Sequence, residues 1–253
     1  MARTDAGRVL TEQHRATQIQ IRARALSDYL KLWPIWEGDE DSFRQMVVAA
    51  IVLVRAYHGL SAGAGGNYFE SFRQAEGVPG QALARLADPI DEDMVTTSLF
   101  VTGQDSVANS LRAGRTAEEA RAAALTKTSG SLTRHVLAGG RDTLLQSVAS
   151  DKEALGWFRV TGRNPCAFCA LLASRGPVYK SDTVGFQAHD HDACTVEPMY
   201  SRDAEWPGRG REFKDLYNEA VLEAEQAGEL RRGTSNDLLN AFRRRLERDR
   251  SSN

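Results

Sequence analysis

The sequence predicts a mostly α-helical protein with one small α+β element, and three observations support this fold class. Apolar residues recur at steps of three and four along most of region 1–150, as on one face of a helix. The pattern changes at Trp157, where the segment WFRVTG alternates and carries β-branched and aromatic residues. Helical periodicity returns after Pro198. We therefore predict an N-terminal helical array over 1–150, an α+β element with short strands over 151–205, and C-terminal helices with a basic tail over 206–253.

The first elements follow from their start and stop signals. An apolar face over 10–33 predicts a helix that a proline ends. An acidic first turn predicts a second helix that runs toward Tyr57, and the glycine-rich segment GLSAGAGGN at 59–67 is expected to break or bend it. The segment NYFESFRQAEG then predicts a separate helix closed by Gly77.

Two longer helices complete the N-terminal region. One is predicted from the acidic turn at 91–93 through apolar positions as far as Leu111. Thr116, with Glu119 three residues later, has the spacing of a capping box and predicts a helix that extends to about residue 150. These helices carry no motif that we can connect to catalysis, so we interpret their apolar stripes as core or as surface for partner helices. In the α+β element, the segment PVYKSDTVGFQ is expected to supply one or two more short strands.

Composition places the chain among soluble globular proteins. Hydrophobic residues make up 42% of its 253 residues and charged residues 26%, which is enough to build a core. The net charge of −2 gives no general attraction to nucleic acid or to anionic membranes. The longest apolar run, MVVAAIVLV, is far shorter than the roughly 20 residues that span a bilayer, and the first residues lack a secretory signal pattern. We therefore expect an intracellular protein with no membrane contact.

Every cysteine of the chain and two of its five histidines lie in one stretch, 164–194. The first two cysteines form a C-x2-C pair, a spacing that lets two thiolates reach one ion across a tight turn. With one histidine and the third cysteine they make a Cys3His set, which is a standard tetrahedral set for zinc. The candidate ligands are Cys166, Cys169, His189 and Cys194, with His191 as the alternative histidine. The sequence therefore predicts a structural zinc site in the α+β element, or the remnant of one.

Three other interpretations of this stretch stay open. A C-x2-C at a helix N-terminus is typical of redox-active thiols, although no βαβ succession surrounds it here. A cysteine and a histidine could also form a nucleophilic pair, with Asp182 or Asp190 orienting the histidine. The cysteines could finally be buried structural thiols beside unrelated surface histidines. A disulfide scaffold is the weakest explanation, because three thiols cannot all pair with one another.

The segments WFRVTG, CAFCALLASRGPVY and AHDHDACTVEPMY, in that order, resemble the MuF-like minor capsid proteins of tailed bacteriophages, especially phages of actinobacteria. The similar portion spans Trp157–Tyr200. In that family the C-x2-C pair is followed by a histidine and a C-x-C, commonly as H-x-H-C-x-C. Here Asp192 stands where the first cysteine of the C-x-C would be. Either His191 or Asp192 then completes the ligand set, or packing holds the fold without a metal.

The resemblance implies a structural protein of head morphogenesis, found in the host cytoplasm during assembly and then inside the virion near the portal vertex. It implies the portal protein and the scaffold or major capsid protein as partners. Some relatives are labelled capsid maturation proteases, and this is our alternative. The chain has no H-E-x-x-H and no defined Ser/His/Asp order, so we favour a protein without enzymatic activity.

The C-terminal tail is a candidate contact for packaged DNA. Residues 231–250 include seven arginines and three acids, a local charge of +4. We expect Arg243, Arg244 and Arg245 to meet DNA phosphates or an acidic portal surface. A solvated helix face is the simpler interpretation of the same charges.

Overall fold

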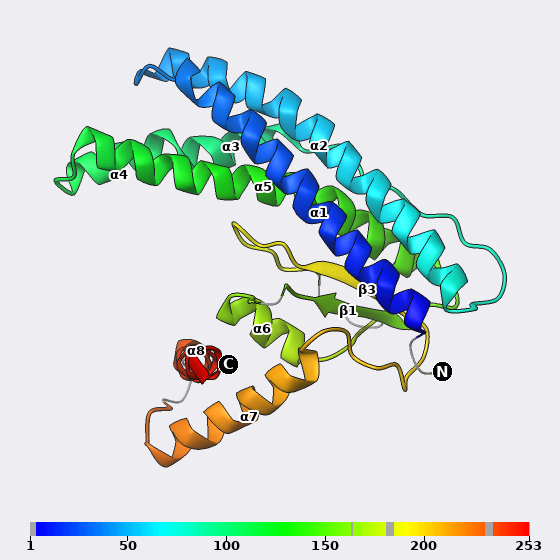
Figure 1. Cartoon of the computed structure of the whole chain (residues 1–253). Coiled ribbons are helices and arrows are strands. Elements are labelled where there is room, and N and C mark those ends of the chain that lie inside the picture. The colour runs from blue at the N-terminus through cyan, green and yellow to red at the C-terminus, as the bar shows by residue number, and fades with distance from the viewer. Residues whose placement is uncertain (1–3, 163, 181–184, 231–234, 253) are drawn as a thin grey trace.

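The computed structural model describes residues 4–162, 164–180, 185–230 and 235–252. The predicted class, mostly α with a small β element, is confirmed. The elements are α1 (Asp5–Leu32), the 3-10 turn η1 (Trp33–Ile35), α2 (Glu40–Ala75), α3 (Glu92–Thr102), α4 (Gln104–Arg112), α5 (Ala117–Ser150), β1 (Gly156–Val160), α6 (Ala167–Ser174), β2 (Val178–Tyr179), β3 (Thr195–Met199), α7 (Gly210–Gln226) and α8 (Ser235–Ser252). Helices α1 to α5, here called the helical array, lie over the sheet, and α6 to α8, here called the C-terminal lobe, lie on its other side (Figure 1).

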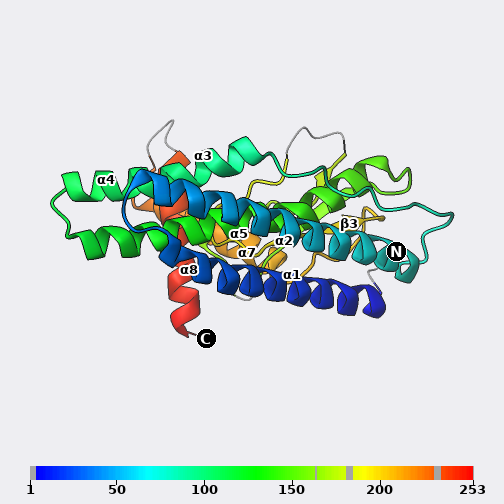
Figure 2. The ribbon, with the colours of Figure 1, turned by 90° about the horizontal axis from the view of Figure 1, so that it is seen from above.

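The long helices α1, α2 and α5 run side by side and enclose the main core (Figure 2). This core buries large side chains from each of them and from the shorter helices, which explains why the apolar stripes predicted helices here. Its fully buried members include Tyr29, Phe43, Met46, Leu99 and Leu132. By length and composition α2 could cross a membrane, but the core helix of a soluble protein meets the same criterion.

The predicted break at 59–67 is wrong, because α2 continues through this segment. Gly65 and Gly66 serve close packing instead, whereas a Cβ on Gly59 or Gly63 would meet nothing within 4 Å. A Cβ on Gly65 would lie 2.9 Å from the carbonyl oxygen of Gly140, and a Cβ on Gly139 would lie 2.3 Å from that of His58. The backbones of α2 and α5 therefore approach more closely than side chains would allow.

The single helix predicted from 91 to Leu111 is divided into α3 and α4. The division falls at Gly103, whose φ of −97° and ψ of −93° are not helical. A Cβ at this position would lie 2.4 Å from the ring of Phe43. The bend thus lets the backbone pass directly over a buried aromatic ring. The capping box of Thr116 and Glu119 is confirmed at the start of α5.

The sheet has three antiparallel strands in the order β2, β1, β3. The central strand β1 is the WFRVTG segment, and β2 is one short strand from the segment that followed it. The sequence did not indicate β3, which pairs Thr195 with Val160 and Pro198 with Trp157. Pro198 is tolerated because β3 lies at the sheet edge, where one side of the strand needs no backbone donor.

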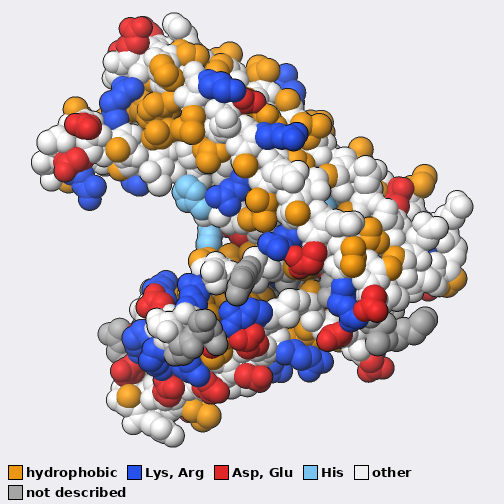
Figure 3. Space-filling model, in the orientation of Figure 1, with side chains coloured by type: hydrophobic (Ala, Val, Ile, Leu, Met, Phe, Trp, Pro, Cys, Tyr) orange, Lys and Arg blue, Asp and Glu red, His pale blue; other side chains and the backbone are white. Residues whose placement is uncertain are grey.

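The C-terminal lobe has a small core of its own. Alanines of α6 pack against Phe213 on α7 and against Phe242 and Leu246 on α8. Figure 3 shows the lobe separated from the helical array by a hollow, with histidine side chains at its back. The Cys/His stretch joins these two parts of the molecule.

Candidate metal centre

The C-x2-C pair lies at the first turn of α6. Cys166 is the N-cap residue, and its Sγ accepts a hydrogen bond from the backbone N–H of Cys169 at 3.4 Å. Two residues three apart at a helix start face the same side, so both sulfurs point away from the lobe core. Cys169 is buried and Cys166 is exposed.

The segment that leads into β3 brings the other donors to these thiols. The Nε2 of His189 lies 3.2 Å from the Sγ of Cys166. Two sets of three ligand atoms form, each with all its atoms within 4.8 Å of one another. The first set is Cys166, Cys169 and His189, and the second is Cys169, Asp192 and Cys194. Cys169 belongs to both sets, so its sulfur is the centre of the cluster.

This donor set suits zinc. Zinc bonds of about 2.3 Å to sulfur and about 2.0 Å to nitrogen place tetrahedral ligands roughly 3.5–4 Å apart, close to the spacing within each set. The Oδ2 of Asp192 is buried and accepts no hydrogen bond within the described chain, although it lies 3.6 Å from the guanidinium of Arg159, and one carboxylate oxygen of Asp192 belongs to the second ligand set. Cys166, Cys169 and His189 would hold the ion, with Cys194 or Asp192 as the fourth ligand.

His191 lies apart from the thiols. Its backbone has a φ of 64°, in the left-handed region, which turns the chain between His189 and Asp192. The His191 ring packs against α5, where a Cβ on Gly130 would lie 2.6 Å from Nε2. Of the two predicted histidines, the structure therefore brings His189 to the cysteines, and His191 is in neither set of ligand atoms among the described residues.

Asp192, which stands at the expected cysteine position, is held by two arginines. Its carboxylate lies 3.7 Å from Arg141 and 3.6 Å from Arg159, and all three side chains are buried. Its Oδ1 also accepts the backbone N–H of Cys194 at 2.6 Å. Burial by itself would raise the pKa of the Asp192 carboxyl, but Arg141, Cys194 and Arg159 together outweigh it and lower the pKa. The group is therefore a carboxylate at neutral pH.

Arg141 also fixes the backbone that carries the ligands. From α5 its Nε donates to the carbonyl of Cys194 at 2.9 Å, and its Nη2 donates to the carbonyl of Asp192 at 3.0 Å. The ring of Phe186 stacks on Arg159 at 3.7 Å and on Arg141 at 5.1 Å. Neither arginine was predicted as a site residue. One signal was available in the sequence. In both α5 and β1 the arginine occupies a position that the apolar periodicity assigns to the buried side of the element.

Cys166 and Cys169 differ in protonation when no metal is bound. The hydrogen bond from the Cys169 side chain, the Cys169 backbone N–H and the charge of His189 lower the pKa of Cys166 to about 5. Because Cys169 donates to Cys166 and lies against Cys194, its own pKa is raised. Cys166 is thus the thiolate, and a metal ion would displace the proton of Cys169. A cavity of about 250 Å³ lies over the cluster, lined also by Arg22 and Asn164.

A family model of the VG15 protein matches residues 6–220, which include the helical array, the sheet and the Cys/His stretch. The chain belongs to the VG15 protein family. It is 30% identical over 178 residues to the Gene 15 protein of Mycobacterium phage D29, an alignment that covers 54% of the chain and 64% of that relative. No solved structure matches the chain. The chain is thus a member of a bacteriophage protein family, and the alignment spans less than two thirds of the phage D29 protein.

Of the two aspartates considered as partners of a nucleophilic pair, the structure describes only Asp190, which does not lie in that role. Asp182 lies outside the described residues. Asp190 pairs with Arg134 of α5 at 3.0 Å, so it fastens the ligand segment to the array. In this VG15 family member the histidine beside Cys166 has no described carboxylate that orients it.

The arginines of α8 are largely paired within the lobe. Arg244 forms an ion pair with Glu229, and Arg245 forms one with Glu219 at 2.6 Å. Arg243 donates to the side chain of Asn240. Residues 206–253 include ten basic and nine acidic side chains, so α7 and the connecting segment offset the charge of the tail. Contact with DNA remains a prediction, with Arg243 as the best placed of the three.

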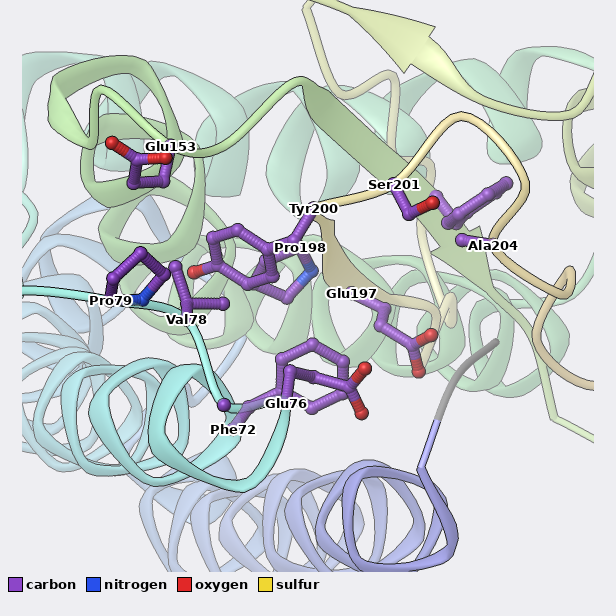
Figure 4. A pocket seen from close by; sticks show the side chains of 12 residues that line it. Phe72, Glu76, Val78, Pro79, Glu153, Glu197, Pro198, Tyr200, Ser201 and Ala204 are labelled. Atoms are coloured by element: carbon purple, nitrogen blue, oxygen red, sulfur yellow. The ribbon is translucent and has the colours of Figure 1, made fainter. Parts of the chain in front are cut away.

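A second cavity, of about 230 Å³, is lined by residues from α2, β1 and β3 and shares no described lining residue with the first (Figure 4). Two of its carboxylates hold the start of α1. Glu76 accepts hydrogen bonds from the N–H and hydroxyl of Thr4, and Glu197 accepts one from Thr11 at 2.6 Å. The two carboxylates of this cavity therefore have a structural role, which is to hold the first turns of α1 in place.

Proposed function

We propose that this chain is a structural minor capsid protein of a tailed bacteriophage, in which a zinc ion joins the C-terminal lobe to the helical array. Membership in a phage protein family and the resemblance of Trp157–Tyr200 to MuF-like proteins support the capsid role. The observation that carries the zinc site is the meeting of Cys166, Cys169 and His189, which come from segments about twenty residues apart in sequence.

Each half of the proposed site is anchored in a different part of the molecule. Cys166 and Cys169 belong to α6, and so to the lobe. The segment with His189 and Cys194 is held by Arg141 and Arg134 of α5, and so by the array. When bound, zinc supplies bonds that a small element cannot obtain from apolar burial. The residues of the chain orient the donors, and the ion would fix the lobe relative to the array.

Metal analysis tests the zinc site directly. We expect about one zinc ion for each chain purified without chelator, and loss of that zinc in the double variant Cys166→Ser, Cys169→Ser. The matched control is His191→Ala, which removes a neighbouring imidazole that lies outside both ligand sets and should retain the metal. If the wild-type chain contains no metal and the double variant folds normally, the zinc site is wrong.

The capsid role is tested in assembled particles. We place the chain inside the head near the portal vertex, in contact with the portal, scaffold or major capsid protein. Quantitative proteomics of purified procapsids and virions should find the chain in both, and cross-linking should connect it to portal peptides. Absence of the chain from both kinds of particle would contradict the proposal.

A capsid maturation protease is the second candidate, and one contact favours it. The exposed Cys166 lies 3.2 Å from His189, as in a thiolate and imidazole pair, and a cavity opens beside them. This candidate predicts that co-expressed capsid or scaffold protein is cleaved and that Cys166→Ala abolishes cleavage. A chelator separates the two candidates, because it would free the thiolate of a protease but unfold a zinc-dependent lobe.

A further inference from the structure

The three thiols of the chain differ in how far solvent reaches them. All three border the cavity of about 250 Å³ that lies over the cluster. Cys166 is exposed at this cavity, whereas Cys169 and Cys194 are only 2% and 5% exposed. A small oxidant dissolved in water therefore reaches the sulfur of Cys166 first, because oxidation of a thiol depends on its exposure.

The surroundings of Cys166 suit a thiolate, which is the form of cysteine that reacts with oxidants. Its Sγ accepts the backbone N–H of Cys169 at 3.4 Å at the start of α6, where the helix dipole favours negative charge. The Nε2 of His189 lies 3.2 Å from the same sulfur. The ring of Phe168 packs on the ring of His189, with 5.0 Å between their centroids, and so holds the imidazole beside Cys166.

Cys169 is placed to react with an oxidised Cys166. The two sulfurs lie within 4.8 Å of one another in the first ligand set. Residues three apart in a helix have Cα atoms roughly 5 Å apart, inside the range of about 4.4–6.8 Å that a disulfide spans without movement of the backbone. Among the described residues, Cys194 shares a ligand set with Cys169 but not with Cys166. Cys169 is therefore the thiol nearest to the exposed sulfur.

We propose that Cys166 and Cys169 are a peroxide-sensitive pair, which closes to a disulfide and opens again with a dithiol reductant. The Cys166 thiolate attacks one oxygen of hydrogen peroxide, so that the S–O bond forms, the O–O bond breaks and hydroxide leaves. The sulfur of Cys169 then attacks the sulfenic acid. The S–S bond forms, the S–O bond breaks, and the hydroxyl group leaves as water with the proton of Cys169. The two thiols thus supply the two electrons that reduce one peroxide to two waters.

The consequence for the lobe rests on the proposed zinc site, because the disulfide consumes two of its donors. After closure, α6 offers no thiolate to an ion that His189 and Cys194 approach from the other side. Oxidation would therefore release the proposed link between the C-terminal lobe and the helical array, and reduction would restore the donors. The disulfide itself requires only the sulfurs of the chain, so the redox pair and the zinc site can fail separately.

Peptide mapping of the full chain tests the pair directly. Trypsin places Cys166 and Cys169 together in peptide 164–175 and Cys194 in peptide 181–202. After dilute hydrogen peroxide and alkylation of free thiols, peptide 164–175 should be unalkylated and lighter by two hydrogen atoms, while Cys194 should be alkylated. Dithiothreitol should restore both thiols. Zinc measured in the same samples should fall in step with the disulfide.

Two single variants separate the roles of the thiols. Cys166→Ser removes the exposed sulfur and should slow the oxidation of Cys169 by about tenfold. Cys194→Ser retains the pair and is the matched control, in which peptide 164–175 should still close. Because each variant changes a proposed metal ligand, the wild-type chain in urea provides a further control. Cys194 should be oxidised there as well, because the fold no longer shields it.

Three results would overturn the proposal. The first is a wild-type chain whose thiols all stay reduced in peroxide. The second is a Cys166 that proceeds to sulfinic acid without forming a disulfide. The third is a disulfide that joins peptide 164–175 to peptide 181–202. A reduced chain that contains no zinc, yet closes the Cys166 and Cys169 pair in peroxide, would contradict the zinc site and support the redox pair.

Discussion

In the helical array, buried aromatic and long aliphatic side chains from several helices form one continuous core, whereas in the C-terminal lobe α6 contributes only alanines to a core of eight buried residues. The array also has close helix contacts through glycine, such as Gly65 on Gly140. The lobe has a smaller apolar core around Phe213, Phe242 and Leu246, and its α7–α8 ion pairs are largely exposed. The lobe is therefore the part that the proposed metal site would stabilise most.

Metal removal should give the largest difference between the two parts. In zinc-finger peptides a structural zinc contributes an apparent 10–16 kcal/mol to folding, more than a small alanine-rich core provides. Hydrogen exchange after addition of a chelator should therefore show lost protection in α6 to α8 and retained protection in α5. The double variant Cys166→Ser, Cys169→Ser should show the same pattern without chelator. Equal loss of hydrogen-exchange protection in the helical array and in the C-terminal lobe would show that the metal does not stabilise the lobe selectively.

Arg141→Met should have the next largest effect, because it joins the ligand segment to the array. The substitution leaves Asp192 with one cation and the Cys194 carbonyl without its donor. Breaking a buried pair of this kind costs about 3–5 kcal/mol, measurable by urea unfolding. The control on the same helix is Arg134→Met, which removes the half-exposed pair with Asp190 and should cost about 1 kcal/mol or less. Similar losses in both variants would show that Arg141 has no special role.

Acidification should destabilise the array through buried histidines. Burial lowers the pKa of His14 to about 4, against about 6.5 in the unfolded chain. The neutral ring therefore contributes stability that is fully present above pH 6.5 and is lost as the pH falls toward 4, by up to about 3 kcal/mol. His14→Gln should flatten the dependence of the unfolding free energy on pH over this range. An unchanged slope would mean that His14 is protonated in the folded state.

The smallest effect is expected on the exposed face of α8. Arg245→Gln removes the pair with Glu219 and should change stability by about 1 kcal/mol or less, because water screens exposed ion pairs. Joint replacement of Arg243, Arg244 and Arg245 by glutamine should weaken DNA binding if these side chains contact phosphate, and weaken it most at low salt. A DNA affinity that changes neither with salt nor with these substitutions would exclude α8 as the DNA contact.

Local sequence signals predicted the helices well, because their information lies within a few residues. Thr116 and Glu119 marked the start of α5, and the alternation at Trp157 marked β1. Signals that depend on distant partners failed. The glycine-rich segment 59–67 predicted a break, but Gly65 packs on Gly140 of α5 within a continuous helix. A proline inside β3 argued against a strand, although an edge strand tolerates it.

The candidate site was predictable in composition but not in geometry. The spacing of Cys166 and Cys169 placed both thiols on one helix turn, which is a local property. The choice between the two histidines depends on the left-handed backbone at His191, which residue type does not reveal. Arg141 could not be found, because its role depends on a segment fifty residues later in the chain.

The carboxylate at position 192 is tied to two buried cations. Asp192→Cys would create the C-x-C of the MuF-like proteins that this segment resembles, yet it would remove the carboxylate that pairs with Arg141 and Arg159. A simultaneous change of at least one arginine to a neutral residue would be needed for the thiol to be tolerated. The residues at positions 141, 159 and 192 therefore depend on one another, because a change of charge at one position leaves a buried charge at another without its partner.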